Sequence, residues 1–140
     1  MAKVTPVQRT KAYWKKHWPD VEIDNAQHWI PFGPTDPRRI KFKITGMRKD
    51  LFGIIDLIAI DTFSIIGIQV CGQDFAAHDR KILESNFSYK WLKINCIKCG
   101  CHGGAKLELW GWRQIINKDS PTKQKKWEPR IKKYALGDFE

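Results

Sequence analysis

Two β-branched apolar runs lie close together in the middle of the chain, and they limit its fold more than any other feature. They cover residues 54–60 and 64–71 and read IIDLIAI and SIIGIQVC. A short turn separates them, which predicts two adjacent strands of a buried hairpin. Asp56 interrupts the first run. A carboxylate inside an apolar strand needs a partner, and a cation is the leading candidate.

The segments around this hairpin predict an alternation of helices and strands. Thr5 and Pro6 favour the start of a helix over 7–18, because a threonine cap and a proline at the first position are typical helix starts. The other expected elements are a helix over 74–85, one or two helical turns over 88–94, and extended segments over 21–29, 105–112 and 127–136. We therefore predict one α/β domain over 1–140, with a central mixed sheet of about four or five strands flanked by helices.

Residues 31–49 are rich first in proline and then in basic side chains. The prolines and glycines predict a loop, in which the alternation of Ile40, Phe42 and Ile44 with charged residues leaves open a strand with one charged face. We expect this loop to bring positive charge to the mouth of the hairpin, where phosphate groups of DNA would bind. The expected DNA-binding residues are Arg38, Arg39, Lys41, Lys43, Arg48 and, on the following helix, Arg80.

The composition is strongly basic and indicates the kind of partner. Lys and Arg number 25 against 15 Asp and Glu, which gives a formal net charge of +10. Cationic side chains that contact phosphates release condensed counterions, so nucleic acid is the favoured partner, and a charge that only aids solubility is the alternative. The chain starts without an apolar leader, and Asp56 and Asp61 interrupt its most apolar region. We expect a cytoplasmic protein without a membrane span.

Three cysteines and a histidine cluster late in the chain. Cys96, Cys99, Cys101 and His102 are suitable zinc ligands, and Cys96 and Cys99 have the spacing of a zinc knuckle. Ligands so close in sequence rarely surround one tetrahedral ion without a second, distant pair. Zinc therefore remains an alternative, and with it a small zinc-stabilised accessory protein.

Seven tryptophans are present, and most are expected to pack in or beside the core. Trp127 follows Lys125 and Lys126 directly, so it could instead stack on an unpaired base.

The central third of the chain resembles a nuclease family. Its pattern resembles that of the PD-(D/E)XK superfamily. The pattern consists of an aspartate in an apolar strand, a turn, and a second strand. The second strand ends in an acid or amide, then one further residue, then a functional side chain. More narrowly, the segments KDLFGIID (49–56), GIQV (67–70), RKIL (80–83) and WGW (110–112) resemble small phage-type proteins related to Holliday junction resolvases. The predicted order of helix, strand, hairpin, helix and strand is similar to that family's core.

This resemblance implies a restriction-endonuclease-like fold and a metal-dependent DNA endonuclease, acting on branched or structured DNA in a bacterial or phage-infected cell. It implies that magnesium or manganese is bound by Asp56, by Gln69 in place of the second acid, and by the Val70 carbonyl. Some relatives act as symmetric dimers, so a homodimer is open.

The resemblance also implies that Cys71 occupies the position of the catalytic lysine. A neutral thiol cannot stabilise developing phosphorane charge as an ammonium does, so Lys49 or Lys81 is expected to supply that charge. The same departure leaves open a nuclease-fold DNA-binding protein whose catalysis has decayed. Structural roles are open as well: Asp56 as a hydrogen-bonded residue at a strand end, and Asp50 as a cap, an ion-pair partner or a second metal ligand.

Overall fold

A mixed five-stranded sheet in the order β1-β4-β5-β6-β7 forms the body of the molecule, and a separate two-stranded sheet pairs β2 with β3. The structure is a computed structural model that describes residues 3–62, 64–94, 104–116, 118–119, 121–122 and 124–139. The strands are β1 (Glu22–Asn25), β2 (His28–Pro31), β3 (Gly46–Lys49), β4 (Leu57–Ile60), β5 (Ser64–Cys71), β6 (Gly104–Ile116) and β7 (Lys125–Tyr134). The helices are α1 (Pro6–His17), α2 (Pro37–Phe42), α3 (Phe75–Leu83), α4 (Asn86–Lys93) and the 3₁₀ helix η1 (Leu136–Phe139). The predicted α/β class is confirmed.

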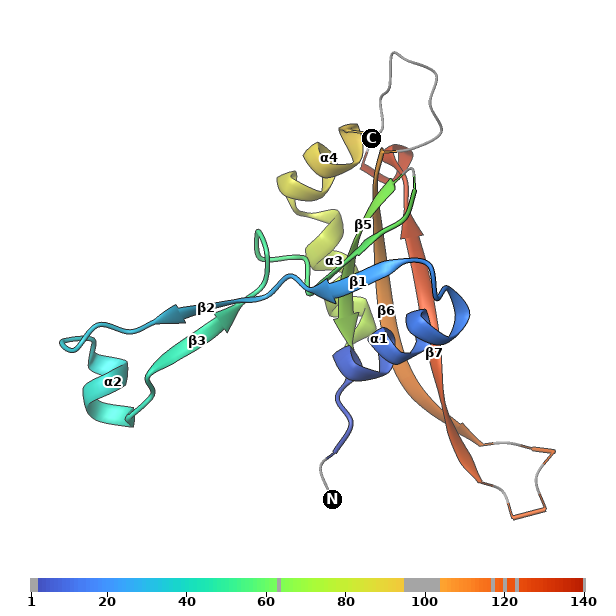
Figure 1. Ribbon diagram of the computed structural model, residues 1–140, viewed down its shortest axis with the longest axis horizontal. Coiled ribbons are helices and arrows are strands. Elements are labelled where there is room, and N and C mark those ends of the chain that lie inside the picture. Colours follow the sequence, from blue (N-terminus) through green and yellow to red (C-terminus); the bar gives the residue numbers. More distant parts are fainter. Residues whose placement is uncertain are drawn as a thin grey trace.

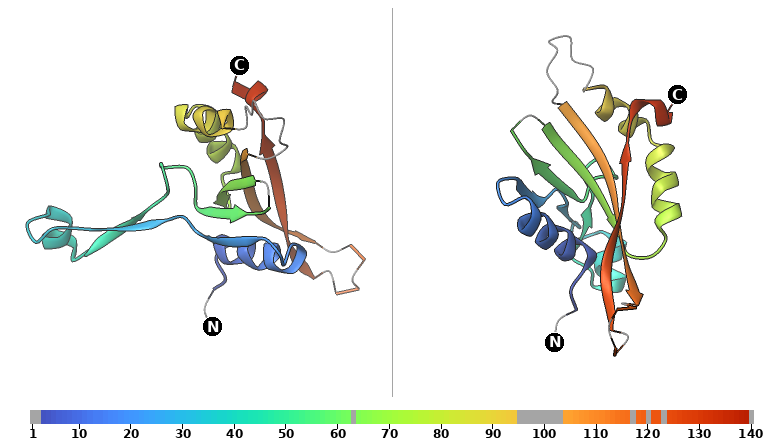
Figure 2. Two further views of the ribbon diagram at one scale, coloured as in Figure 1. Left: turned by 45° about the horizontal axis from the view of Figure 1, so that its top comes forward. Right: turned by 90° about the vertical axis from the view of Figure 1, so that its right-hand side faces the viewer.

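Helices cover both faces of the five-stranded sheet (Figures 1 and 2). α1 packs on one face, and α3 and α4 pack on the other. The β5–β6 pair is parallel, and the other neighbouring pairs of this sheet are antiparallel. A parallel pair needs a long crossover connection, and α3 and α4 lie within it.

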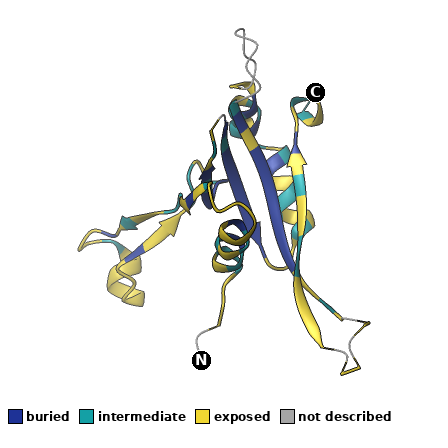
Figure 3. Cartoon of the chain, turned by 45° about the vertical axis from the view of Figure 1, so that its right-hand side comes forward, coloured by how far each residue is buried: buried dark blue, intermediate teal, exposed yellow. Residues whose placement is uncertain are grey.

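The sheet divides the hydrophobic core into two clusters, because successive side chains of a strand point to opposite faces. On the α1 face, Leu57, Ile68 and Val70 pack with Trp14 and Trp110. On the face of α3 and α4, the cluster consists of Ile54, Ile55, Cys71, Ile82, Leu92, Leu107, Leu109 and Tyr134. The central strands are therefore buried on both sides, as Figure 3 shows.

The start of α1 agrees with its sequence signal. Thr5 Oγ1 accepts a hydrogen bond from the Gln8 amide at 3.2 Å, and the Gln8 side chain accepts one from the Thr5 amide at 2.9 Å. This reciprocal capping box satisfies two amide groups that a helix start leaves free. The helix begins at Pro6 and ends at His17, one residue before the predicted end.

The hairpin forms, but its first strand is shorter than predicted. β4 begins only at Leu57, and Asp56 lies at a bend directly before it, so the placement of Asp56 inside a strand is wrong. Residues 51–55 form a tight turn, closed by hydrogen bonds in both directions between Leu51 and Ile55. Phe52 and Gly53 have φ angles of 54° and 75°, a left-handed backbone that cannot continue a strand.

Residues 28–49 project from the body as an arm, made of β2, α2 and β3 (Figure 1). The predicted extended segment 21–29 is divided by it, because β1 belongs to the body and β2 to the arm. The basic side chains of this segment therefore lie along the arm, and the prediction that they gather at the mouth of the hairpin is wrong.

The tip of the arm is helical where a loop or a charged strand was expected. Asp36 caps α2 by accepting a hydrogen bond from the Arg38 amide at 2.8 Å, Pro37 occupies the first turn, and Lys43 ends the helix with a φ of 55°. Ile40 and Phe42 belong to this helix and are exposed, so they do not form one face of a strand.

The predictions on a membrane span and on zinc concern parts of the chain that the structure describes incompletely or not at all. In the described part of the chain, no helix combines the length and apolar character needed to cross a membrane. The segment with Cys96, Cys99, Cys101 and His102 lies outside the described residues, so the zinc alternative stays a prediction.

Candidate active site

The backbone of Asp56 is fixed at the junction of three segments. Its amide donates to the Ile68 carbonyl of β5 at 2.9 Å, and its carbonyl accepts from the Ala26 amide after β1 at 2.9 Å. The register pairs Leu57 with Ile68, so Asp56 lies opposite Gln69. Cross-strand neighbours share one face of a sheet, and this face is the one that α3 and α4 cover.

The carboxylate of Asp56 is buried, with 5% of the residue exposed, and it accepts three hydrogen bonds. Its Oδ2 atom accepts from the Val70 amide at 2.7 Å and from Gln69 Nε2 at 3.1 Å. Its Oδ1 atom accepts from Gln27 Nε2 at 3.1 Å. The predicted proximity of Asp56 and Gln69 is therefore present in the structure.

Asp50 and Lys81 complete this group of side chains. Gln27 Nε2 also donates to Asp50 Oδ1 at 2.8 Å, so one amide bridges the two carboxylates. Lys81 Nζ, from α3, lies 4.0 Å from Asp50 Oδ2, and its side chain is 46% exposed. We call these five residues, Gln27, Asp50, Asp56, Gln69 and Lys81, the carboxylate cluster.

Burial, more than any other cause, raises the pKa of Asp56 to about 7. The neighbouring Asp50 raises it further through a shared hydrogen bond and its negative charge, whereas the Val70 amide and Lys81 lower it. Ionisation of Asp56 in this partly dry site, beside a second carboxyl group, is therefore costly, and Asp56 keeps its proton up to about neutral pH. A bound cation would favour the doubly ionised form instead.

One oxygen of the cluster has no hydrogen-bond partner. Gln69 is 2% exposed, and its Oε1 atom is buried and unpaired while its Nε2 atom donates to Asp56. A buried acceptor without a donor costs roughly 1–3 kcal/mol, so it calls for an explanation. A hard cation beside the two carboxylates would give this oxygen a partner, since Mg²⁺ prefers carboxylate and amide oxygens.

The Val70 carbonyl has a direction that suits the same role. The N–H and C=O of one strand residue point to the same edge, and the Val70 amide meets Asp56 there. Across the described residues, no three His, Cys, Asp or Glu side chains gather closely enough to hold a metal by themselves. The candidate metal ligands are instead the carboxylate oxygens of Asp50 and Asp56, Gln69 Oε1 and the Val70 carbonyl oxygen. Magnesium and manganese prefer oxygen ligands of this kind.

Cys71 cannot replace a catalytic ammonium. It is buried, and burial, together with the negative charges of Asp56 and Asp74, raises its pKa to about 11. The thiol is therefore neutral at physiological pH. Of the two lysines proposed in its place, Lys81 reaches the cluster, whereas no contact between described residues joins Lys49 to it.

Five of the six predicted DNA-binding residues lie on the arm, and the sixth, Arg80, lies beside the cluster on α3. Arg38, Arg39 and Lys41 belong to α2, Lys43 ends it, and Arg48 lies on β3, so all five are on the arm. Arg80 is on α3, and its side chain is exposed, next in sequence to Lys81.

Gln27 is the member of the cluster that the sequence did not reveal. It follows β1 and reaches both carboxylates from more than 20 residues away in the sequence, at separations of 23 and 29. Glutamine is common at surfaces and has no distinctive spacing here. The only available signal was that the acid pair needed a hydrogen-bond donor.

Known proteins were compared with the chain in three ways. No family model, no curated protein and no solved structure matches it.

Proposed function

We propose that this chain is a metal-dependent DNA endonuclease with a restriction-endonuclease-like core, acting on branched or structured DNA. The observation that carries the proposal is the carboxylate cluster, in which two carboxylates bridged by one amide, a buried unpaired amide oxygen and one lysine come together beside the β4–β5 hairpin.

The topology of the body supports the proposed core. The arm (β2, α2 and β3) is inserted between β1 and β4. Apart from it, the order along the chain is a helix, three antiparallel neighbouring strands (β1, β4 and β5), two helices, and a strand parallel to β5. This is the order that the resemblance to the PD-(D/E)XK superfamily implies. The resemblance implies metal-binding residues on the central hairpin, and here Asp56 lies directly before β4 and Gln69, an amide in place of the second acid, lies on β5.

The residues of the cluster have separate tasks in the proposed reaction. Asp50, Asp56, Gln69 and the Val70 carbonyl would hold magnesium or manganese, which when bound supplies charge neutralisation at the phosphate and a more acidic water. Gln27 keeps the two carboxylates in register through its bridging amide. Lys81 is half exposed, so its ammonium can reach a phosphate oxygen and stabilise negative charge that develops on it.

The arm would position the DNA. Its basic side chains include Lys41, Lys43 and Arg48, which are exposed and make no ion pair with any described residue. Arg38, in contrast, is engaged within the arm, because it pairs with Asp36 at 2.9 Å and stacks on Phe32. Phosphate contacts of this kind fix orientation without reading sequence.

The test compares the protein with its Asp56→Asn variant on four-way branched and linear duplex DNA, with magnesium or manganese. We expect wild-type cleavage and a loss of about 10²–10³-fold in rate for the variant, because a ligand and a negative charge are lost. Asp24→Asn is the matched control, since Asp24 is an exposed carboxylate on the neighbouring strand β1. Equal rates for Asp56→Asn and wild type, or no cleavage by either, would contradict the proposal.

A DNA-binding protein with decayed catalysis is the second candidate. The neutral Cys71 thiol at the position of the family's lysine favours it. This candidate predicts salt-dependent binding of branched DNA without cleavage under any metal. It also predicts that Lys81→Met leaves the affinity for branched DNA unchanged and that neither protein cleaves it.

A further inference from the structure

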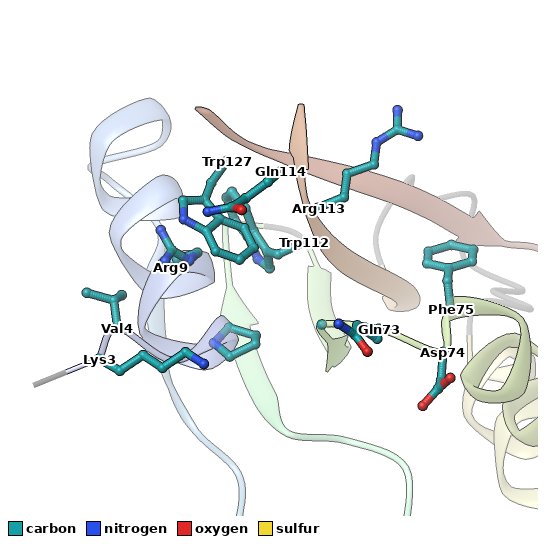
Figure 4. A pocket seen from close by; sticks show the side chains of 12 residues that line it. Lys3, Val4, Arg9, Gln73, Asp74, Phe75, Trp112, Arg113, Gln114 and Trp127 are labelled. Atoms are coloured by element: carbon teal, nitrogen blue, oxygen red, sulfur yellow. The ribbon is translucent and has the colours of Figure 1, made fainter. Parts of the chain in front are cut away.

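A cavity of about 560 Å³ lies at the carboxyl end of β5 (Figure 4). In Figure 1 this end of the strand lies away from η1. The start of α1, the turn after β5 and the β6–β7 hairpin line the cavity. Its lining includes Lys3, Arg9, Gln73, Trp112, Gln114 and Trp127. Ligand pockets are typically about 300–1,000 Å³, so this one can hold a small organic group such as a nucleotide.

Aromatic rings form much of its wall, and two of them are held in place. Trp112 is 6% exposed, and its Nε1 donates to Thr10 Oγ1 of α1 at 2.8 Å. Trp127 is 40% exposed, and the Arg9 guanidinium lies 3.9 Å from the centre of its ring. Figure 4 shows both tryptophans beside Arg9 on the α1 side of the cavity. Such rings provide flat surfaces on which a base can stack.

Positive charge prevails around the cavity. Lys3, Arg9 and Arg113 line it with a single carboxylate, that of Asp74, whose side chain points away from the tryptophans in Figure 4. None of the three cations forms an ion pair with a described residue. Arg9 Nε is buried and has no hydrogen-bond partner there. The cavity therefore suits an anionic group.

Hydrogen-bonding groups complete the wall. The side-chain amides of Gln73 and Gln114 line the cavity and can donate and accept. β5 ends at Cys71, opposite Gly111, so beyond Gly111 the strand β6 has β7 on one side and no described strand on the other. Backbone groups of β6 at that open edge can meet the edge of a base.

We propose that this cavity binds an unpaired nucleotide of a DNA substrate, with the base against Trp112 and Trp127 and the phosphate near Arg9 and Lys3. The proposal rests on the proposed endonuclease function and adds the structural feature that its substrate would carry. The bases of a paired duplex are stacked on one another, so their faces are not available to Trp112 and Trp127. Unpaired bases, in contrast, are recognised by stacking on aromatic side chains.

The position of the cavity relates it to the carboxylate cluster. Gly72, which lines the cavity, follows Gln69 by three residues. At about 3.3 Å per strand residue, the two sites are roughly 10 Å apart along the chain. The cluster lies on the α3 and α4 face, so a DNA strand held in the cavity would pass the end of β5 to reach it. The proposed endonuclease would then act close to unpaired nucleotides of branched or otherwise interrupted duplexes.

Fluorescence anisotropy of labelled DNA, in EDTA so that cleavage plays no part, tests the proposal. The probes are a fluorescein-labelled duplex with one unpaired thymidine and the fully paired duplex of the same sequence. We expect wild type to bind the first about tenfold more tightly, and Trp127→Ala to abolish this difference while affinity for the paired duplex stays the same.

Trp18→Ala is the matched control, because Trp18 is 43% exposed and does not line this cavity. Its preference for the unpaired thymidine should equal that of wild type. Equal affinity of wild type for the two probes, or an unchanged preference in Trp127→Ala, would overturn the proposal. The outcome is separate from that of the cleavage test. A preference for the unpaired thymidine that needs Trp127, without any cleavage, would support the nucleotide site and refute the endonuclease. Cleavage without such a preference would support the endonuclease and refute the nucleotide site.

Discussion

The arm and the body are stabilised in different ways. Strands β4, β5 and β6 of the body are flanked by helices and contribute side chains to both core clusters. Within the arm, Phe32 and Gly46 are the buried positions, and five large apolar side chains are exposed: Trp29, Ile40, Phe42, Ile44 and Met47. Local contacts hold the arm, such as the hydrogen bond from Arg39 Nη1 to the Phe32 carbonyl at 3.1 Å.

This difference suggests a division of labour. The carboxylate cluster needs fixed distances, and the body supplies them through a buried hairpin whose backbone is bonded on both sides. The arm needs only to present charge, so it can stand outside the core. Its exposed Ile40 and Phe42 also fit contact with DNA, because apolar side chains on DNA-binding arms can insert between base steps.

The largest expected effect separates affinity from catalysis. Replacing Lys41, Lys43 and Arg48 together by glutamine should weaken DNA binding about a hundredfold at moderate salt, because three phosphate contacts are lost. The slope of log affinity against log salt should fall by up to about 2.7. Titrations at several salt concentrations measure both.

Asp56→Asn is the complementary change, in the body. It should leave DNA affinity in EDTA close to that of wild type while it lowers the cleavage rate by about 10²–10³-fold. If the triple arm variant binds as tightly as wild type, the arm is not the DNA-binding surface, and the division of labour fails.

Two glycines provide a matched pair for stability. A Cβ at Gly67 on β5 would lie 2.6 Å from Ile55 Cδ1, inside the core, whereas one at Gly46 would lie 2.6 Å from the Ile30 carbonyl oxygen, inside the arm. Gly67→Ala should lower the free energy of unfolding by about 1–3 kcal/mol through overpacking. Gly46→Ala should open the arm and leave the main thermal transition unchanged.

Thermal unfolding and limited proteolysis distinguish these outcomes. Gly46→Ala should increase cleavage by protease within residues 28–49, and Gly67→Ala should lower the melting temperature. A fall in melting temperature of equal size for both variants would mean that arm and body unfold as one unit.

The smallest expected effect concerns Asp56 and pH. The folded-state pKa is about 7 and the ordinary value is 3.8, so the folded chain binds more protons between these values. The Asp56 carboxyl therefore lowers the free energy of unfolding as pH rises from about 4 to about 7. Asp56→Asn should be more stable than wild type by on the order of 1–2 kcal/mol at pH 8 without metal, because a buried charge beside Asp50 is removed.

Melting temperatures in EDTA at pH 4 and pH 8 check this prediction. The gain of Asp56→Asn should largely vanish near pH 4, because the folded-state carboxyl is then protonated and no buried charge remains to be removed. Asp24→Asn is the control, because the Asn25 amide and Lys11 lower the pKa of that exposed carboxyl, so its removal gives no such gain. A variant less stable than wild type at pH 8 would mean that the hydrogen bonds to Asp56 outweigh the cost of its charge.

Local signals in the sequence account for the parts of the fold that were predicted. Thr5 and Pro6 determine the start of α1 through groups only a few residues away, and the apolar run of β5 can be recognised without any knowledge of its neighbours. The approach of Asp56 and Gln69 also followed from adjacency of two strands joined by a short turn.

Competing local signals explain the errors. Asp36 and Pro37 are a helix cap and a first-turn proline, but the alternation of Ile40, Phe42 and Ile44 suggested a strand. The apolar run that begins at Ile54 hid a turn that depends on the left-handed backbone of Phe52 and Gly53. Gln27 reaches the cluster through the tertiary fold, which periodicity does not describe.

The turn of residues 51–55 also bears on the order in which the chain folds. It joins Asp50 to Asp56 through a short loop, closed by the two hydrogen bonds between Leu51 and Ile55. Closing so short a loop costs little chain entropy, whereas Gln27 and Lys81 must be brought in across longer loops. We therefore expect the two carboxylates to come together early in folding, before the amide bridge of Gln27 and the ammonium of Lys81 are in place. Magnesium in a refolding buffer should accelerate this step, since it would neutralise the pair before the rest of the site has formed.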